Sequence, residues 1–119
     1  IKFVNNNKKF PLHGNGDSTR DFIFEDDFNN GLFKLISRGK NGNIYHFSSN
    51  KYYKIRDVVK IVCDLLKVNY KDFIYKTKDR IGKDKYYFLD CNKTSKQLNW
   101  KPKINIYEGI KKIIKYKNK

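Results

Sequence analysis

Apolar positions recur at helical spacing in several stretches of the chain. The most regular stripe predicts a helix over residues 54–67, and six positions form it: Ile55, Val58, Val59, Val62, Leu65 and Leu66. A second helix is expected after the acidic run at 25–27, because acids favour a helix N-terminus, and Gly39 is its expected end. Its apolar residues at helical spacing are Phe28, Leu32, Leu35 and Ile36.

Two further helices are expected toward the C-terminal end. Asn92 is expected to cap a short helix over 93–98, and Pro102 then blocks continuation. Asn105 opens the last helix. Its apolar stripe is Ile106, Ile110, Ile113 and Ile114.

Short runs rich in aromatic and β-branched residues predict strands between these helices. The runs are 10–13, 19–24, 43–48, 72–77 and 85–90, and the first two flank a Gly14-Asn15-Gly16 turn. Short strands alternating with about four helices indicate an α/β fold, small and α+β-like, in a single domain over residues 1–119. No apolar run approaches the roughly 20 residues of a membrane helix, so no membrane partner is expected.

The charge of the chain is strongly positive but spread along it. The net charge is +15, which ordinarily suggests a polyanionic partner such as nucleic acid. However, Lys, Asn, Ile, Tyr and Phe dominate the chain, and AT-rich codons favour all five, which offers a second explanation of the charge. A free-standing module that binds nucleic acid or another polyanion is therefore the less favoured alternative.

Cysteine and histidine show no metal-ligand spacing. Cys63 lies in an apolar run and is expected to be buried, and Cys91 is far from it along the chain. His13 and His46 are isolated. No structural metal is expected, and a reducing, cytoplasmic compartment fits best.

Arginine is rare in this lysine-rich chain, which suggests that it is used where lysine cannot serve. The four arginines are Arg20, Arg38, Arg56 and Arg80. Arg20 on a predicted strand and Arg80 where a strand meets a loop are candidates for binding a phosphate or carboxylate, because a planar guanidinium can bind two oxygens. The alternative is that each pairs with its neighbouring acid, Asp21 or Asp79. The other two arginines are expected at the surface.

No catalytic arrangement can be assembled from these residues alone. No Ser/His/Asp or Cys/His set is evident, and Asp84 near several tyrosines is a weak acid/base signal. The Gly14-Asn15-Gly16 turn precedes a predicted strand and not a helix, so it is not a dinucleotide fingerprint. Trp100 is expected to pack over a helix end.

Four motifs, in order, nevertheless resemble one family. The segments "FPLHGNGDSTRDFIFEDD", "GNIYHFS", "DRIGKDKYYFLD" and "LNWKPKINIYEGI" cover the chain from about residue 8 to 116. Together they resemble the C-terminal, substrate-binding portion of the extended short-chain dehydrogenases/reductases, the NAD-dependent epimerases and dehydratases of nucleotide sugars. The resemblance is closest to the dTDP-glucose 4,6-dehydratases.

The resemblance implies roles for individual residues. Arg20 and Arg80 match the family's diphosphate-binding arginines, and Pro11 and His13 match the stretch that flanks the nucleobase. Asp84 would bond a ribose hydroxyl or orient Arg80.

Two candidate positions depart from the family pattern. Lys83 stands where the family usually has His, and His46 falls where the dehydratases carry an Asn beside the diphosphate. These departures leave the sugar nucleotide open: dTDP-glucose is favoured, with UDP-, GDP- and CDP-sugars as alternatives.

The resemblance places the catalytic chemistry elsewhere. The glycine fingerprint for NAD, the catalytic Tyr-x-x-x-Lys pair and the dimer helices belong to an N-terminal Rossmann half. The chain is therefore expected to be part of a longer homodimeric lyase of deoxysugar synthesis, with no catalytic, cofactor or metal-binding residue of its own. An epimerase or decarboxylase of the same family is the alternative.

Overall fold

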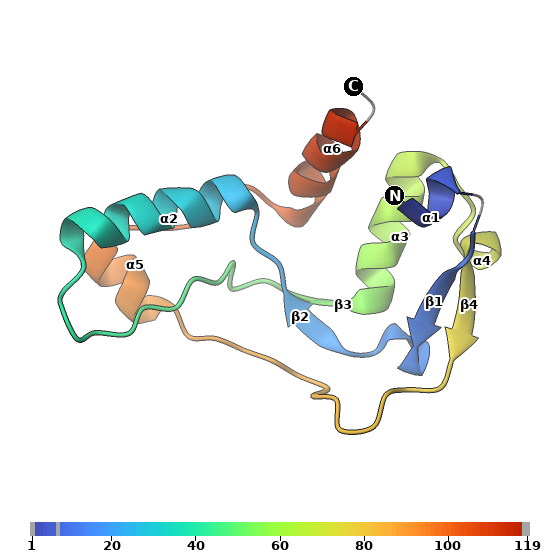
Figure 1. Ribbon diagram of the computed structural model, residues 1–119, viewed down its shortest axis with the longest axis horizontal. Helices are drawn as coiled ribbons and strands as arrows, with labels where there is room; N and C mark the ends of the chain where they lie inside the picture. Colours follow the sequence, from blue (N-terminus) through green and yellow to red (C-terminus); the bar gives the residue numbers. More distant parts are fainter. Residues whose placement is uncertain (1, 7, 118–119) are drawn as a thin grey trace. The chain divides into compact units, whose positions relative to one another are not determined.

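Residues 2–6 and 8–117 are described in a computed structural model (Figure 1). Short helices and strands alternate, as the sequence predicts, in a small α+β arrangement. The elements of this part of the chain are α1 (Lys2–Asn5), β1 (Phe10–His13), the 3-10 turn η1 (Gly14–Gly16), β2 (Thr19–Asp21), α2 (Glu25–Arg38), β3 (Tyr52–Lys54), α3 (Ile55–Leu66), α4 (Tyr70–Phe73), β4 (Ile74–Thr77), α5 (Asn92–Leu98) and α6 (Ile106–Lys117). β1 pairs with β4, and β2 pairs with β3.

The chain divides into two compact units. Unit 1 takes the described residues within Ile1–Arg20, Tyr53–Tyr87 and Ile110–Lys119. Unit 2 takes those within Asp21–Tyr52 and Phe88–Gly109.

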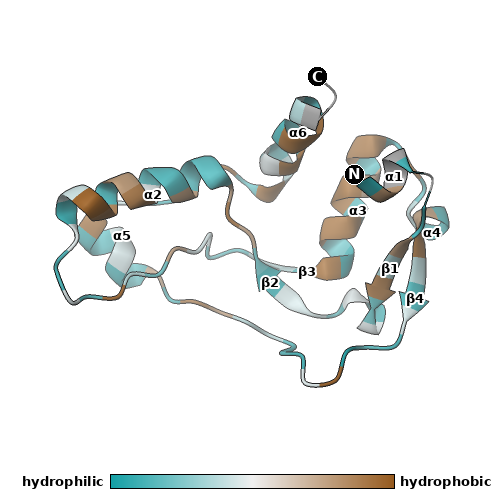
Figure 2. Ribbon diagram, in the orientation of Figure 1, coloured by the Kyte–Doolittle hydropathy of each residue, from teal (hydrophilic) through white to brown (hydrophobic). Residues whose placement is uncertain are grey.

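Unit 1 is built on the parallel pair β1 and β4 and on α3. Phe10 pairs with Ile74 and His13 with Thr77, so both strands end at the same edge. The predicted stripe of α3 is confirmed where it meets β1: Leu12, Val59 and Cys63 form a buried core, ringed by partly buried apolar residues. Figure 2 shows α3 as a largely hydrophobic helix. Cys63 is fully buried, as predicted.

Unit 2 is centred on Trp100, which is 1% exposed. Its indole Nε1 donates to the Asp27 carbonyl at 3.0 Å, in the first turn of α2. The Asp27 carboxylate accepts from the backbone N–H groups of Lys103 and Ile104 at 2.9 and 2.8 Å. This buried acid therefore ties α2 to the segment that leads into α6.

The helix predicted after the acidic run is confirmed as α2, but its apolar positions are not its buried face. The residues buried on this helix are Asp27 and Gly31, and a Cβ at Gly31 would overlap the Phe47 ring. The apolar residues Leu32 and Ile36 are instead exposed, Ile36 to 83%. The buried face of α2 is set by the Phe47 ring, which lies close to Gly31, and by the backbone N–H groups that donate to Asp27. The spacing of apolar residues detects neither.

Several predicted strands are shorter than expected or absent. Residues 43–48 form no strand; Tyr45 there is held by side-chain bonding, its hydroxyl donating to Gln97 Oε1 at 2.9 Å. The 85–90 run makes only one bridge, between Tyr86 and Thr19. The 19–24 run is a strand only to residue 21, and the 72–77 run opens as the end of α4 before β4 begins. Strands form only where a neighbouring strand pairs with the run, as β3 does with β2 and β1 with β4.

Two predicted helix caps have different outcomes. Asn105 caps α6 as predicted, its Oδ1 accepting from the N–H of Glu108 at 2.9 Å. Asn92 is already the first residue of α5, and its N–H donates to Asp90 Oδ1 at 2.8 Å. The predicted cap at Asn92 is therefore wrong by one residue, since Cys91 is the N-cap.

In the part of the chain that the structure describes, no helix has the length and apolar character needed to cross a membrane.

Candidate functional site

The parallel strands of unit 1 place His13 beside Thr77 at their common end. Leu12 is buried, so Pro11 and His13, its neighbours along β1, lie on the other face of the strand. His13 Nδ1 lies 2.8 Å from Thr77 Oγ1 and 3.2 Å from the Lys78 carbonyl. These two contacts fix the orientation of the imidazole.

The loop after β4 folds back on the turn after β1. Gly14 has a φ of +54°, and a Cβ there would overlap the Asp79 carboxylate. The same carboxylate accepts from Lys83 Nζ at 2.7 Å and from the Arg80 N–H at 2.9 Å. The hydrogen bond from Lys83 is the main reason that the pKa of Asp79 lies below its usual value of 3.8. Asp79 therefore pairs with Lys83, and its bond to Arg80 goes to the main chain.

Arg20 joins the far end of this loop to β2. Its Nη1 donates to the Thr19 carbonyl and its Nη2 to the Asp84 carbonyl, both at 2.7 Å. The Thr19 N–H donates to the Lys85 carbonyl at 2.8 Å. The alternative prediction, in which Arg20 pairs with Asp21, is wrong: the Asp21 carboxylate accepts from the N–H and hydroxyl of Ser49.

The cations of the loop differ in exposure. The Lys83 side chain is only 12% exposed, held by Asp79. Arg80 is exposed, and no carboxylate of the described residues lies within ion-pair distance of its guanidinium. Lys78 and Lys85 of this loop are exposed too, but Arg80 differs from them in having a guanidinium, which can bind two oxygens of one anion.

Arg56 stabilises the same turn, a role that its neighbour Asp57 concealed in the sequence. Arg56 pairs with Asp17, just after the Gly14–Gly16 turn. The backbone N–H of Ile55 donates to the Ser18 carbonyl at 3.0 Å. No local pattern in the sequence indicates this pair, because 39 residues separate its members.

The predicted site residues divide between the two units. Those in unit 1 are Pro11, His13, Arg20, Arg80, Lys83 and Asp84. His46 belongs to unit 2, where it is exposed in an irregular segment. Unit 1 by itself therefore joins His13 and the two arginines through one loop, residues 78–86.

A cavity of about 500 Å³ lies in unit 2. Its lining residues are Ser49, Asn50, Asn92, Ser95, Lys96, Lys101 and Pro102. None of the predicted substrate-binding residues lines it.

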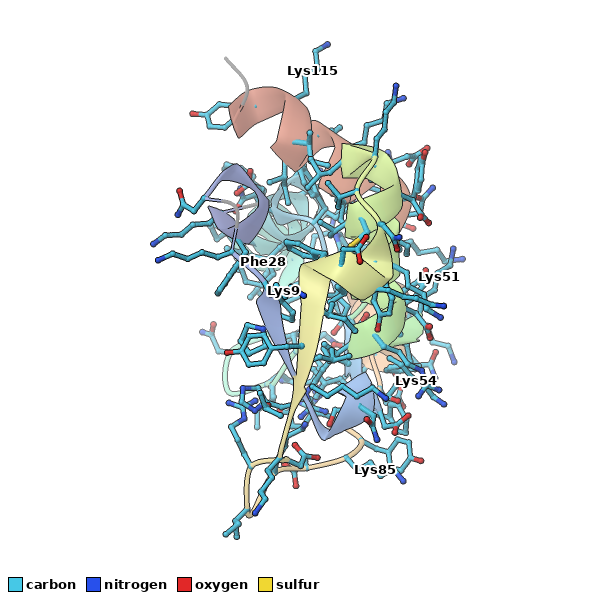
Figure 3. All side chains as sticks on the ribbon, turned by 90° about the vertical axis from the view of Figure 1, so that its right-hand side faces the viewer. Lys9, Phe28, Lys51, Lys54, Lys85 and Lys115 are labelled. Carbon is cyan, nitrogen blue, oxygen red and sulfur yellow. The ribbon has the colours of Figure 1, made fainter. Side chains whose placement is uncertain are left out.

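The basic charge of unit 1 is carried largely by exposed lysines. Lys9, Lys54 and Lys85, labelled in Figure 3, are examples. Each such solvated ammonium group contributes little free energy through an ion pair. In this respect it differs from the guanidinium groups described above.

The described residues do not fit NAD. A dinucleotide pyrophosphate is bound by a glycine turn that leads into a helix N-terminus. Here the Gly14–Gly16 turn leads into β2.

A family model and individual relatives both match this chain, and both are 4,6-dehydratases of nucleotide sugars. A family model described as GDP-mannose 4,6 dehydratase matches residues 1–113. A dTDP-glucose 4,6-dehydratase of Shigella flexneri is 33% identical over 115 residues, which cover 92% of this chain and 32% of that protein. The chain thus spans about a third of the length of this relative.

Solved structures agree with the sequence matches. The crystal structure of dTDP-glucose 4,6-dehydratase from Bacillus anthracis, in complex with NAD, is 25% identical with a TM-score of 0.89, covering 98% of this chain and 37% of that one. A UDP-glucose 4-epimerase from Thermotoga maritima, solved with UDP-glucose, has the same TM-score at 20% identity, over 98% of this chain and 37% of its own, and shows the same fold.

Proposed function

Because the chain belongs to the GDP-mannose 4,6-dehydratase family of extended short-chain dehydrogenases/reductases, we propose that it binds the nucleotide-diphosphate-sugar substrate of an NAD-dependent 4,6-dehydratase. The sequence relatives favour dTDP-glucose as the sugar nucleotide. The observation that carries the proposal is the loop of unit 1, which presents Arg80 at one end and is tied to Arg20 at the other.

Arg80 and Arg20 would bind the diphosphate. Arg80 is exposed and has its guanidinium free for two oxygens of one phosphate. Arg20 uses two N–H groups on carbonyls, and a guanidinium has five. A charge-assisted hydrogen bond of this kind contributes about 1.5–3 kcal/mol.

Pro11 and His13 would flank the nucleobase. They lie on one face of β1, and Thr77 and Lys78 fix the His13 ring. A ring held in one orientation can stack on a base with little further loss of conformational entropy. Asp84, on the same loop as Arg80, would contact the ribose.

Catalysis would belong to residues outside this chain. In the proposed enzyme NAD is bound, and the hydride is moved, by a separate Rossmann part, and the enzyme is a homodimer. The described residues would hold and orient the substrate. The fold match to a UDP-glucose 4-epimerase supports one alternative, an epimerase acting on a UDP-sugar.

Equilibrium binding of three nucleotide sugars to the protein tests the proposal. Isothermal titration with dTDP-glucose, UDP-glucose and GDP-mannose is expected to give the highest affinity for dTDP-glucose. A higher affinity for UDP-glucose would favour the epimerase. If none of the three bound, the proposed function would be wrong.

A further inference from the structure

One carboxylate, that of Asp79, occupies the space beside Gly14 where any other residue would place a Cβ. The contact joins the turn after β1 to the loop after β4. Gly14 also has a positive φ of +54°, so two separate features favour glycine at this position. The loop carboxylate and the glycine turn are therefore fitted to one another.

The same carboxylate organises the loop internally. It accepts from Lys83 Nζ at 2.7 Å and from the Arg80 N–H at 2.9 Å, around a turn in which Gly82 has a φ of +72°. The Lys83 side chain is 12% exposed as a result. Lys83 is thus turned toward the protein while Arg80 stays exposed.

The other end of the loop is held independently. Arg20 donates to the Asp84 carbonyl, and the Thr19 N–H donates to the Lys85 carbonyl. Arg80 therefore lies between two fixed points, the Asp79 contact with Gly14 and the attachment to β2.

We propose that Asp79 is a positioning residue, which holds the Arg80 loop on the Gly14 turn so that Arg80 is preorganised for an anion. The proposal rests on the proposed function, because the anion is taken to be a nucleotide diphosphate. It also revises the expected role of Lys83. The ammonium group of Lys83 stabilises the loop by pairing with Asp79 and does not bind the substrate directly. Electrostatics alone gives the opposite expectation, since a carboxylate near a diphosphate repels it.

Positioning by Asp79 and repulsion by its carboxylate predict opposite changes in affinity when the charge is removed. The binding of dTDP therefore tests the proposal. Asp79→Asn removes a negative charge, so simple repulsion predicts tighter binding of dTDP. Loss of positioning predicts weaker binding, by about tenfold, because the loop must then be ordered on binding. Asp72→Asn, an exposed acid of α4 in the same unit, is the matched control and should change the affinity less than about twofold. Binding to Asp79→Asn as tight as to the native protein, or tighter, overturns the proposal.

Further variants test the pair of Lys83 with Asp79 and the contact of Asp79 with the Gly14 turn. Lys83→Arg should retain most of the affinity because it can still pair with Asp79, whereas Lys83→Met should weaken binding as Asp79→Asn does. Gly14→Ala should also act like Asp79→Asn, while Gly42→Ala, which has a φ of +74° and open space around it, controls for backbone strain. Equal affinities for Lys83→Arg and Lys83→Met contradict the role of the pair.

Hydrogen exchange of the free protein separates this proposal from the proposed function. If native protein fails to bind dTDP, the proposed function fails, but the amides of residues 78–86 still report on the loop. Faster exchange in Asp79→Asn than in Asp72→Asn supports positioning. Unchanged exchange in this segment overturns it.

Discussion

Arginine and lysine have different tasks around the Arg80 loop. Arg20 binds two carbonyl oxygens at once, each at 2.7 Å, which requires the planar fork of a guanidinium. Lys83 makes a single contact with Asp79, for which an ammonium group suffices. The geometry at position 20 thus favours arginine over lysine.

Replacing Arg20 by Lys should loosen the loop although the charge is kept. A lysine can reach one of the two carbonyls but cannot bridge them as the guanidinium does. We expect faster amide exchange over residues 84–86 and a loss of dTDP affinity of about five- to tenfold. Arg38→Lys is the control, because Arg38 makes one long contact of 3.5 Å with the Leu98 carbonyl. Identical exchange in both variants would show that Arg20 does not anchor the loop.

The ionisation of Asp79 gives a pH prediction. Lys83 lowers the pKa of Asp79 in the folded protein below 3.8, so the carboxylate form is favoured by folding. The contribution of the Asp79 carboxylate to folding stability is fully present above about pH 4. It is lost as the pH falls through the lowered pKa. A carboxyl-carbon NMR titration should give a midpoint below 3.8, and Lys83→Gln should raise it. A midpoint that does not respond to that substitution would contradict the pair.

At the scale of elements, the sequence predicts helices better than strands. The stripe of α3 spans three turns and packs against the buried Leu12 of β1, so periodicity alone locates it. The face of α2 is decided by Asp27 and Gly31, one a buried acid and the other a glycine under an aromatic ring, and neither is a hydrophobic signal. Short strands depend on partners distant in the sequence, and the run at 43–48 has none.

In the candidate site, too, local features can be predicted and contacts between distant segments cannot. Arg20, Arg80 and His13 can be selected from residue chemistry and motif resemblance. The contact of Asp79 with Gly14 and the pair of Arg56 with Asp17 cannot, because each joins segments far apart in the chain. Local patterns therefore identify the groups that would touch a ligand and miss those that hold them in place.

The attachment of α2 to the segment before α6 can be tested through Asp27. Asp27→Ala leaves two part-buried backbone N–H groups without their acceptor, which we expect to cost about 2–5 kcal/mol of unfolding free energy. Glu25→Ala, two positions earlier in the exposed first turn, should cost less than about 1 kcal/mol. Urea unfolding of both variants measures the difference. Equal costs would mean that the carboxylate contributes only through the helix dipole.

At the scale of the whole molecule, binding through the overall net charge of +15 and binding at the specific site predict different salt dependences of the affinity. A diphosphate bound through two arginines should lose less than about tenfold in affinity between 50 and 200 mM salt, whereas a surface with many phosphate contacts loses about 10³-fold or more. Titrating dTDP and a double-stranded DNA at both salt concentrations checks this. A steep loss for dTDP, or tight DNA binding at the higher concentration, would favour the polyanion-binding alternative.

The measurement that tests the central claim most directly is the affinity of dTDP for Arg80→Ala beside Lys78→Ala. Both substitutions remove one positive charge from the same exposed loop, but only Arg80 can bind two phosphate oxygens. We predict that Arg80→Ala weakens binding about tenfold or more and that Lys78→Ala changes it less than about twofold. Equal, small effects of the two substitutions would contradict the assignment of this loop as the diphosphate-binding element.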